Sequence, residues 1–87
     1  MPFFVYLLEC RDQSFYCGYT TDLAKRVEAH NAGKGAKYTS KRRPVRLIYS
    51  EEYATRTEAM RRELAIKKMG RKQKELLLGF IATSFSQ

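Results

Sequence analysis

The stretch Phe15–Asn31 constrains the fold more than any other part of the chain. It opens with aromatic and apolar residues that favour a half-buried strand, and Gly18 then permits a sharp turn. A helix over about Asp22–Asn31 follows, with Thr20 or Thr21 as its cap and an aspartate in its first turn, where negative charge is favoured. The pattern therefore predicts a strand, a structural glycine turn and an amphipathic helix.

The spacing within that helix separates a buried stripe from a polar edge. Leu23 and Val27 lie four residues apart and define the buried stripe. Arg26 and His30 are also four apart, so they are expected to project together beside it. With the strand-end Tyr16, they predict a polar cluster at the rim of the core.

The segment before this stretch predicts a hairpin. Phe3–Leu8 is apolar at every position, which indicates a strand covered on both faces and central in its sheet. Arg11–Ser14 is polar and turn-like. An even-numbered loop puts Tyr6 and Tyr16 on opposite faces of the sheet, whereas an odd loop or one bulge puts them on the same face. If both tyrosines serve one site, we predict the odd register.

A basic loop and a third strand come next. The loop over residues 33–44 carries five basic residues and no acidic one, and it can hold one helical turn. A strand over Val45–Ser50, rich in β-branched and aromatic residues, is expected after it. Thr55 and Glu58 then fit a capping box, which predicts a helix running to about Met69 and ending at Gly70.

The two C-terminal helices are predicted to pack on the sheet. Ala59, Met60 and Ile66 mark the buried face of the first, and Glu63 lies on that same face. The second is expected over Arg71–Ala82. Its packing residues are expected to be Leu76, Leu77, Phe80 and Ile81.

These elements predict an α+β fold in the order β-β-α-β-α-α, with a small, mainly antiparallel three-stranded sheet flanked by helices. The length of 87 residues fits one small domain. We expect that domain to span residues 1–82, with residues 83–87 as a frayed tail.

Charge is unevenly distributed and indicates an anionic partner. The net charge is +8, and residues 34–87 hold fourteen basic and five acidic side chains. Such asymmetry favours nucleic acid as the partner. No apolar run approaches the roughly 20 residues that span a bilayer, so no membrane partner is expected. Cys10 and Cys17 lack metal-ligand or C-x-x-C spacing, so we expect buried, reduced thiols and a cytoplasmic protein.

Each candidate site residue has two interpretations when taken alone. Glu63 on an apolar face is either salt-bridged, with Arg26 as an available partner, or a ligand of a hard cation such as magnesium. Arg26 is either a helix-surface charge or a fork for a phosphate oxygen. His30 is either a cap or core-edge residue or part of a site. Tyr6 and Tyr16 are either core aromatics whose hydroxyls are hydrogen-bonded within the protein or site residues.

Together these residues resemble the GIY-YIG nuclease motif. Val5-Tyr6-Leu7 and Tyr16-Cys17-Gly18 resemble its two halves at the usual short separation. Arg26 and His30 match the family's helix arginine and the histidine or tyrosine that follows it, and Glu63 matches the metal-binding glutamate.

The resemblance covers roughly residues 3 to 78, nearly the whole chain. It is nearest the small stand-alone bacterial proteins of the superfamily, which share the segments Gly-Lys-Gly-Ala-Lys-Tyr-Thr and Arg-Arg-Pro. Those proteins are related to structure-specific resolvase nucleases and to the excinuclease incision domain.

The resemblance implies a metal-dependent endonuclease that hydrolyses phosphodiester bonds in DNA, such as branched or damaged DNA in repair or recombination. Glu63 would hold one Mg²⁺ or Mn²⁺, and Arg26 would bind a non-bridging oxygen. Tyr6 or His30 would be the base, with Tyr16 orienting water or phosphate. The expected nucleic-acid-binding residues are Lys34, Lys37, Lys41, Arg42, Arg43 and Lys67. DNA is favoured over RNA, and no small-molecule cofactor is expected.

One departure from the family pattern bears on catalysis. The excinuclease branch has a lysine directly after its second motif, where this chain has Tyr19. If that lysine acidifies the base, its task falls to Lys34, Lys37 or Lys67, or turnover is weak. The alternatives are therefore a catalytically weak or inactive nucleic-acid-binding module with the same fold, and an RNA-binding accessory protein.

Overall fold

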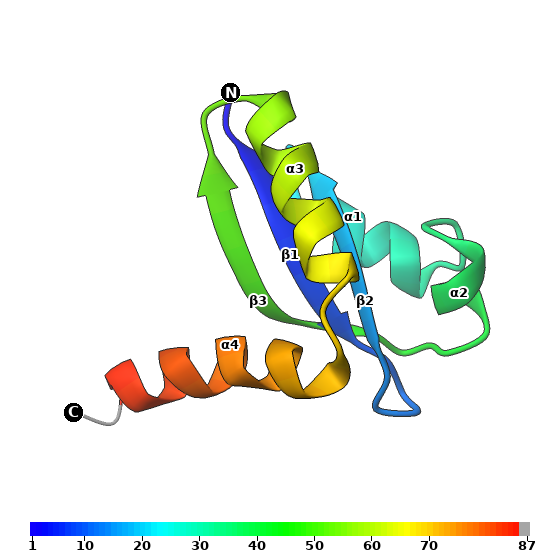
Figure 1. Cartoon of the computed structure of the whole chain (residues 1–87). Coiled ribbons are helices and arrows are strands. Elements are labelled where there is room, and N and C mark those ends of the chain that lie inside the picture. The colour runs from blue at the N-terminus through cyan, green and yellow to red at the C-terminus, as the bar shows by residue number, and fades with distance from the viewer. Residues whose placement is uncertain (86–87) are drawn as a thin grey trace.

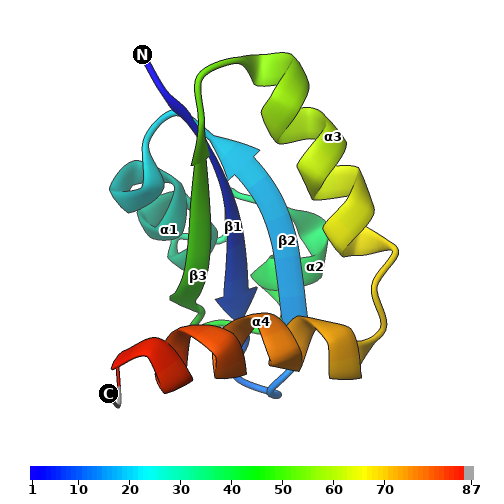
Figure 2. The same cartoon turned by 60° about the vertical axis from the view of Figure 1, so that its left-hand side comes forward.

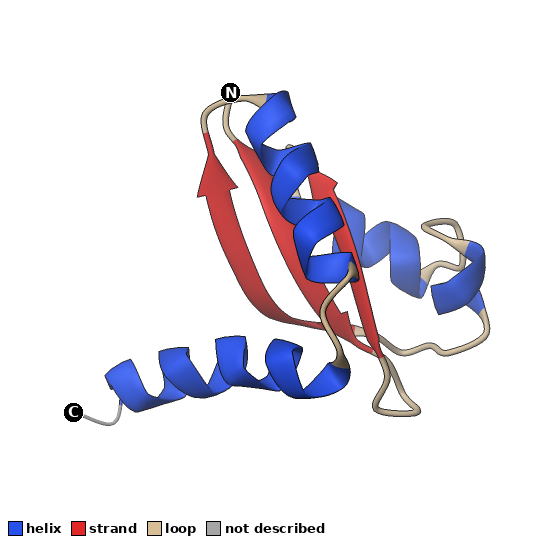
Figure 3. Ribbon diagram, viewed as in Figure 1, coloured by secondary structure: helices blue, strands red, loops and turns tan. Residues whose placement is uncertain are grey.

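A computed structural model describes residues 1–85 of the chain and the side chains of residues 1–79. The elements, in order, are β1 (Phe3–Glu9), β2 (Phe15–Thr20), α1 (Leu23–Asn31), α2 (Lys37–Ser40), β3 (Arg46–Tyr53), α3 (Arg56–Lys67) and α4 (Arg71–Phe85). The three strands form one antiparallel sheet in the order β2-β1-β3, with helices around it (Figure 3). The predicted α+β class and element order are confirmed, and α2 is the helical turn inside the basic loop.

The sheet separates two apolar clusters, because successive residues of β1 point to opposite faces. Val5 and Leu7 face α3, where they join Ala59 and Ile66 in one buried cluster. Tyr6 and Leu8 face the other way, toward a cluster that the stripe of α1 packs against. Helices α1 and α3 therefore cover opposite faces of the sheet, as Figure 1 shows. The prediction that β1 is central is confirmed.

The hairpin between β1 and β2 has the odd register. The Cys10 amide donates to the carbonyl of Ser14 at 2.8 Å, which leaves the three residues 11–13 in the loop. Gln13 closes it at φ 69°, the left-handed geometry of a three-residue hairpin. Because Leu8 pairs with Tyr16 and Tyr6 pairs with Gly18, both tyrosines lie on the α1 face of the sheet.

The helix starts differ in part from the prediction. Asp22, not Thr20 or Thr21, is the N-cap of α1, and its carboxylate accepts from the Lys25 amide at 3.0 Å. A carboxylate accepts that bond as readily as a hydroxyl, and the Thr20 hydroxyl is already engaged, because it accepts from the Asp22 amide. Thr55 caps α3 as predicted.

Two predicted core residues are exposed. Met60 is 40% exposed and Leu76 is 70% exposed, so the prediction that they pack in the core was wrong. A single helical face is too narrow to bury both Ala59 and Met60 against a flat sheet. Leu77 does pack against the α3-side cluster. The predicted packing of Phe80 and Ile81 lies outside the described side chains.

Several boundaries shift by a few residues. Strand β3 extends three residues beyond Ser50, α3 ends at Lys67 rather than near Met69, and α4 continues past Ala82 to Phe85. Helix α4 crosses one end of the sheet in both views (Figures 1 and 2). Residues 86 and 87 of the predicted tail lie outside the described part. Within residues 1–85, no helix has the length and apolarity to cross a membrane.

Candidate active site

A cavity of about 520 Å³ opens at the edge of the sheet formed by β2. It collects side chains from positions 3 to 63, which are otherwise far apart along the chain. The lining residues are Phe3, Tyr6, Tyr16, Gly18, Tyr19, Thr20, Thr21, Arg26, Arg56 and Glu63. Four of the five predicted catalytic residues, namely Tyr6, Tyr16, Arg26 and Glu63, are thus brought together around one cavity.

The cavity has two walls because it wraps around an edge strand. Tyr6, Tyr16 and Arg26 come from the α1 side of the sheet. Tyr19 points to the α3 side, where it packs against that cluster, and Glu63 comes from α3 itself. An edge strand lets groups from opposite faces of a sheet share one space, since no further strand separates them.

His30 lies beneath the cavity instead of lining it. Its side chain is fully buried, and its Nε2 lies 3.0 Å from the Tyr6 hydroxyl. Its Nδ1 lies 2.7 Å from the hydroxyl of Thr39, which itself donates to the carbonyl of Ala36. Because that hydroxyl proton is used, Thr39 accepts from Nδ1–H, and Nε2 accepts the proton of Tyr6.

Burial controls the protonation of this pair. Burial raises the pKa of the Tyr6 hydroxyl well above its ordinary value, Tyr16 raises it further, and the nearby charge of Arg26 only partly opposes this. Burial also lowers the pKa of His30, and the charge of Arg26 lowers it further. At neutral pH the pair therefore consists of a protonated phenol donating to a neutral imidazole.

Two glycines provide the room for this pair. Gly18 lies inside β2 and pairs with Tyr6, so the predicted turn at this glycine was wrong. A methyl group on Gly18 would overlap the hydroxyl end of Tyr6, and one on Gly35 would overlap the imidazole of His30. Glycine is required at both positions because a neighbouring ring occupies the space of a Cβ atom. The segment over residues 33–39 thus seats His30 from one side while Thr39 anchors its Nδ1.

Glu63 forms an ion pair, but not with Arg26. Its carboxylate lies 3.6 Å from the ammonium of Lys67, one turn along α3, and its side chain is 14% exposed. The suggested Glu63–Arg26 salt bridge was wrong, because the two residues stand on opposite walls of the cavity. In the described part of the chain, no three carboxylate, imidazole or thiol groups gather as a metal cluster.

A single carboxylate still suits one kind of metal. Mg²⁺ and Mn²⁺ are hard cations that keep several waters and are commonly held by one or two carboxylates together with substrate phosphates. Among the described residues, Glu63 is the only carboxylate that lines the cavity, and Lys67 is its ion-pair partner at 3.6 Å. The donor set therefore fits a metal that arrives with, or is completed by, a phosphate substrate.

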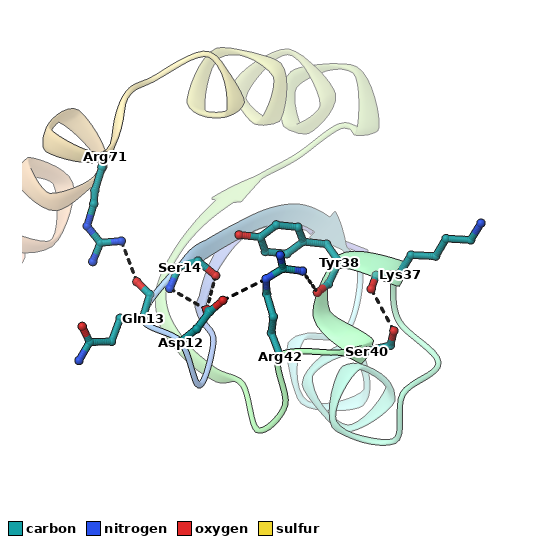
Figure 4. A network of polar contacts seen from close by, with 8 residues as sticks. All are labelled: Asp12, Gln13, Ser14, Lys37, Tyr38, Ser40, Arg42 and Arg71. Carbon is teal, nitrogen blue, oxygen red and sulfur yellow. Dashed lines mark hydrogen bonds and ion pairs between the residues drawn. The ribbon is translucent and has the colours of Figure 1, made fainter.

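The predicted nucleic-acid-binding residues fall into two groups. Arg42 is tied down, because it pairs with Asp12 at 3.1 Å, donates to the Tyr38 carbonyl and stacks on the Tyr38 ring (Figure 4). Arg43 donates to the carbonyls of Ser40 and Asn31. Both arginines therefore hold the basic loop in shape.

The lysines of the loop are free to bind. Lys34, Lys37 and Lys41 are exposed and form no ion pair in the described part of the chain. The ammonium of Lys37 extends away from the cluster around Arg42 (Figure 4). Lys67 is engaged with Glu63.

Sequence reasoning missed two cavity residues, Arg56 and Tyr19. The Arg56 guanidinium donates from Nε and from Nη2 to the Tyr19 hydroxyl, each at 3.3 Å. From the sequence, Tyr19 stands out only as a departure from the family pattern, and nothing local assigns Arg56 to the site. Strand alternation was a usable signal, because it sends Tyr19 to the face that α3 covers.

Comparisons with known proteins identify the family of the chain. Residues 2–76 match the GIY-YIG catalytic domain family. The chain is 56% identical over 75 residues to UPF0213 protein YazA of Bacillus subtilis (strain 168), which covers 86% of this chain and 76% of that protein. It is 55% identical over 73 residues to UPF0213 protein VNG_2274C of Halobacterium salinarum, covering 84% of this chain and 95% of that one.

Solved structures show the same fold. The solution NMR structure of protein EF2693 from E. faecalis matches with a TM-score of 0.65 and 48% identity, over 95% of this chain and 88% of that one. The solution NMR structure of UPF0213 protein BH0048 from Bacillus halodurans matches with a TM-score of 0.60 and 46% identity, over 92% and 85% of the two chains. The cavity, the motif residues and these matches together establish that the chain belongs to the GIY-YIG domain family, among its small UPF0213 members.

Proposed function

We propose that this protein is a metal-dependent endonuclease that hydrolyses phosphodiester bonds in DNA. The observation that carries the proposal is the convergence of Tyr6, Arg26 and Glu63 on one cavity at the β2 edge. A phenol, a guanidinium and a carboxylate supply proton transfer, charge stabilisation and metal binding, which are the needs of phosphodiester hydrolysis. Branched or damaged DNA is the proposed substrate class.

Glu63 would hold Mg²⁺ or Mn²⁺, which when bound neutralises charge on the phosphate and the leaving oxygen. Arg26 would donate to a non-bridging oxygen, and its hydrogen bonds strengthen as negative charge grows there. Tyr16, on the same wall, would orient the attacking water. The exposed lysines of the loop would hold the backbone in a salt-dependent and mostly sequence-blind manner.

The geometry of the Tyr6–His30 pair favours a shared role for these two residues as the base. A phenol with a raised pKa cannot act as a free phenolate at neutral pH. It can take a proton from water only while giving its own proton to His30, whose Nε2 accepts from it at 3.0 Å. In this step a water O–H bond breaks, the water oxygen bonds to phosphorus, and the bond from phosphorus to the leaving oxygen breaks.

Two observations favour a second candidate, a nucleic-acid-binding module with little catalysis. Tyr19 stands where a related branch has a lysine, and the carboxylate of Glu63 already has Lys67 as a neighbour. Such a module would bind DNA with equal affinity with and without divalent metal. The experiment below separates it from the enzyme.

The test is an incubation of the protein with branched, flapped and plain duplex DNA in the presence of Mg²⁺, Mn²⁺ or EDTA. We expect metal-dependent cleavage that Glu63→Gln abolishes while DNA binding persists. Arg26→Ala and Tyr6→Phe should lower the cleavage rate by about 100-fold or more. Equal nicking by wild type and Glu63→Gln would rule out the proposed metal site, and binding without any cleavage would favour the module.

A further inference from the structure

Arg56 occupies the wall of the cavity that faces Arg26. It is the first residue of α3, directly after the Thr55 cap, and it lines the same cavity as Tyr6 and Glu63. Helix α3 covers the opposite face of the sheet from α1, which carries Arg26. The two guanidinium groups therefore reach one cavity from the two sides of β2.

The guanidinium of Arg56 is hydrogen-bonded to a phenol and not to a carboxylate. Two of its N–H groups converge on the hydroxyl of Tyr19, and its Cζ lies 6.0 Å from the centre of the Tyr19 ring. A phenol oxygen orients the guanidinium without cancelling its charge. The remaining N–H groups of the planar fork are left for an oxyanion, the ligand that this fork matches best.

Three arginines outside the cavity are neutralised by carboxylates. Arg42, Arg46 and Arg62 each pair with a carboxylate at 3.1 Å or less. Neither Arg26 nor Arg56 pairs with a carboxylate in the part of the chain that the structure describes. Of the described residues that line the cavity, Glu63 is the one carboxylate, and it is paired with Lys67. Two cations without a carboxylate partner therefore leave a positive field in the cavity.

We infer that Arg56, oriented by Tyr19, binds a second phosphate of the substrate strand, adjacent to the phosphate held by Arg26. The inference rests on the proposed function, because it requires a nucleic-acid strand in the cavity. A strand that crosses the open edge of β2 presents successive phosphates to the two walls in turn. A cavity of about 520 Å³ has room for more than one phosphate group, since small-ligand pockets begin near 300 Å³.

This inference gives Tyr19 a specific role. Tyr19 carries a phenol and no cationic group, and the positive charge beside it is supplied from α3 by Arg56. Tyr19 is a positioning residue for Arg56, because it touches the guanidinium and lets it keep its charge. The expected signature is an effect on substrate affinity, with the rate at saturating substrate preserved.

The test compares Arg56→Gln with Arg61→Gln. Arg61 is an exposed arginine on the same helix that does not line the cavity, so both variants remove one positive charge from α3. Affinity for a fluorescent flapped duplex is measured by anisotropy in EDTA over a range of salt concentrations. Arg56→Gln should weaken binding about tenfold and reduce the slope of log affinity against log salt by about 0.9, the value for one phosphate contact.

Two further variants define the contact. Tyr19→Phe should weaken binding about threefold, since the guanidinium stays but loses its anchor. Arg56→Lys should fall between wild type and Arg56→Gln, because the charge remains but the fork is lost. Thermal unfolding of each variant establishes that it is folded. If Arg56→Gln and Arg61→Gln weaken binding equally, the second phosphate site does not exist.

The readouts keep this inference separate from the proposed function. Affinity measured in EDTA does not depend on cleavage. A protein that binds DNA without cutting it would therefore contradict the proposed nuclease activity and could still show the second phosphate contact. Where cleavage is present, Arg56→Gln should raise KM and leave kcat within about threefold of wild type. A loss confined to kcat would overturn the inference, and an absence of any wild-type binding would overturn both proposals.

Discussion

The hydroxyl of Tyr6 lies 3.0 Å from Nε2 of His30, and the two rings meet at an interplanar angle of 69°. This contact joins the central strand to α1 beneath the cavity. It depends on close approach, because glycines at positions 18 and 35 leave no side chain between the rings and the backbone.

Gly35→Ala should destabilise the protein by about 2 kcal/mol, because the new methyl group would overlap the imidazole of His30. The measurement is urea-induced unfolding, together with the NMR signals of the imidazole. Gly70→Ala is the matched control, since no atom lies within 4 Å of its Cβ position. Equal effects of the two substitutions would contradict the proposed seating of His30.

Stability should fall as the pH drops through about 6.5. Burial lowers the pKa of His30 below that value in the folded state, so just below pH 6.5 the unfolded chain binds more protons than the folded one. The stability due to neutral His30 is present above the unfolded pKa and is lost toward the lower folded pKa. The charged and titratable groups that face the ring are Arg26, Tyr6 and Tyr16, and burial keeps the pKa of Tyr6 far above this pH range.

The measurement is the thermal unfolding midpoint of wild type and of His30→Gln at about pH 7.5 and about pH 5.5. Wild type should lose more stability than the variant over this interval. The carboxylates whose pKa is lowered, Asp12 and Glu51, titrate below this window. Parallel pH profiles of the two proteins would show that His30 does not titrate as a buried neutral group.

Glu51→Gln should destabilise the protein by about 2 kcal/mol. The Glu51 carboxylate accepts from the Tyr49 and Tyr53 hydroxyls and pairs with Arg62 of α3 at 2.8 Å. Burial alone would raise the pKa of Glu51, but these hydrogen bonds outweigh it and lower that pKa. The ion pair therefore ties α3 to β3.

Because Arg62 is next to Glu63, this pair also fixes the rotation of α3 above the cavity. Urea unfolding measures the stability, and the Mn²⁺ concentration needed for half-maximal cleavage reports on the placement of Glu63. Glu52→Gln, at an exposed neighbouring position, is the control and should stay within about 0.5 kcal/mol of wild type. If folded Glu51→Gln needs the same Mn²⁺ concentration for half-maximal cleavage as wild type, the Glu51–Arg62 ion pair does not determine the position of Glu63.

Leu77→Ala should cost about 2 kcal/mol, whereas Leu76→Ala should change stability by less than about 0.5 kcal/mol. Leu77 packs against the cluster between α3 and the sheet, and Leu76 is 70% exposed. The two substitutions remove the same atoms from adjacent positions of α4, so urea unfolding of both isolates the effect of packing. The reverse order would mean that α4 docks with another face.

The sequence predicted the features that depend on local pattern. An unbroken apolar run identified the central strand. Loop parity left two registers open, and the odd one, predicted on the condition that Tyr6 and Tyr16 serve one site, is the one observed. Both follow from the two-residue period of a strand, which tertiary contacts do not alter. The cap at Thr55 was likewise local.

Features that depend on how elements meet were not predictable in the same way. The partner of Glu63 is Lys67 rather than Arg26, because α1 and α3 lie on opposite faces of the sheet. Arg56 lines the cavity because α3 packs over β2 and brings its first residue into contact with Tyr19. Met60 is as apolar as a core residue, but the rotation of α3 about its axis decides whether Ala59 or Met60 is buried, and it buries Ala59.

The position of the cavity at the border of the sheet restricts how this protein can associate with others. Strand β2 has unpaired backbone groups along its outer side, the usual template for pairing with a strand of another chain. A strand added there would fill the opening between Tyr16 and Tyr19 and shut out any substrate. Self-association through backbone pairing is therefore compatible with an accessible cavity only along β3, at the opposite border.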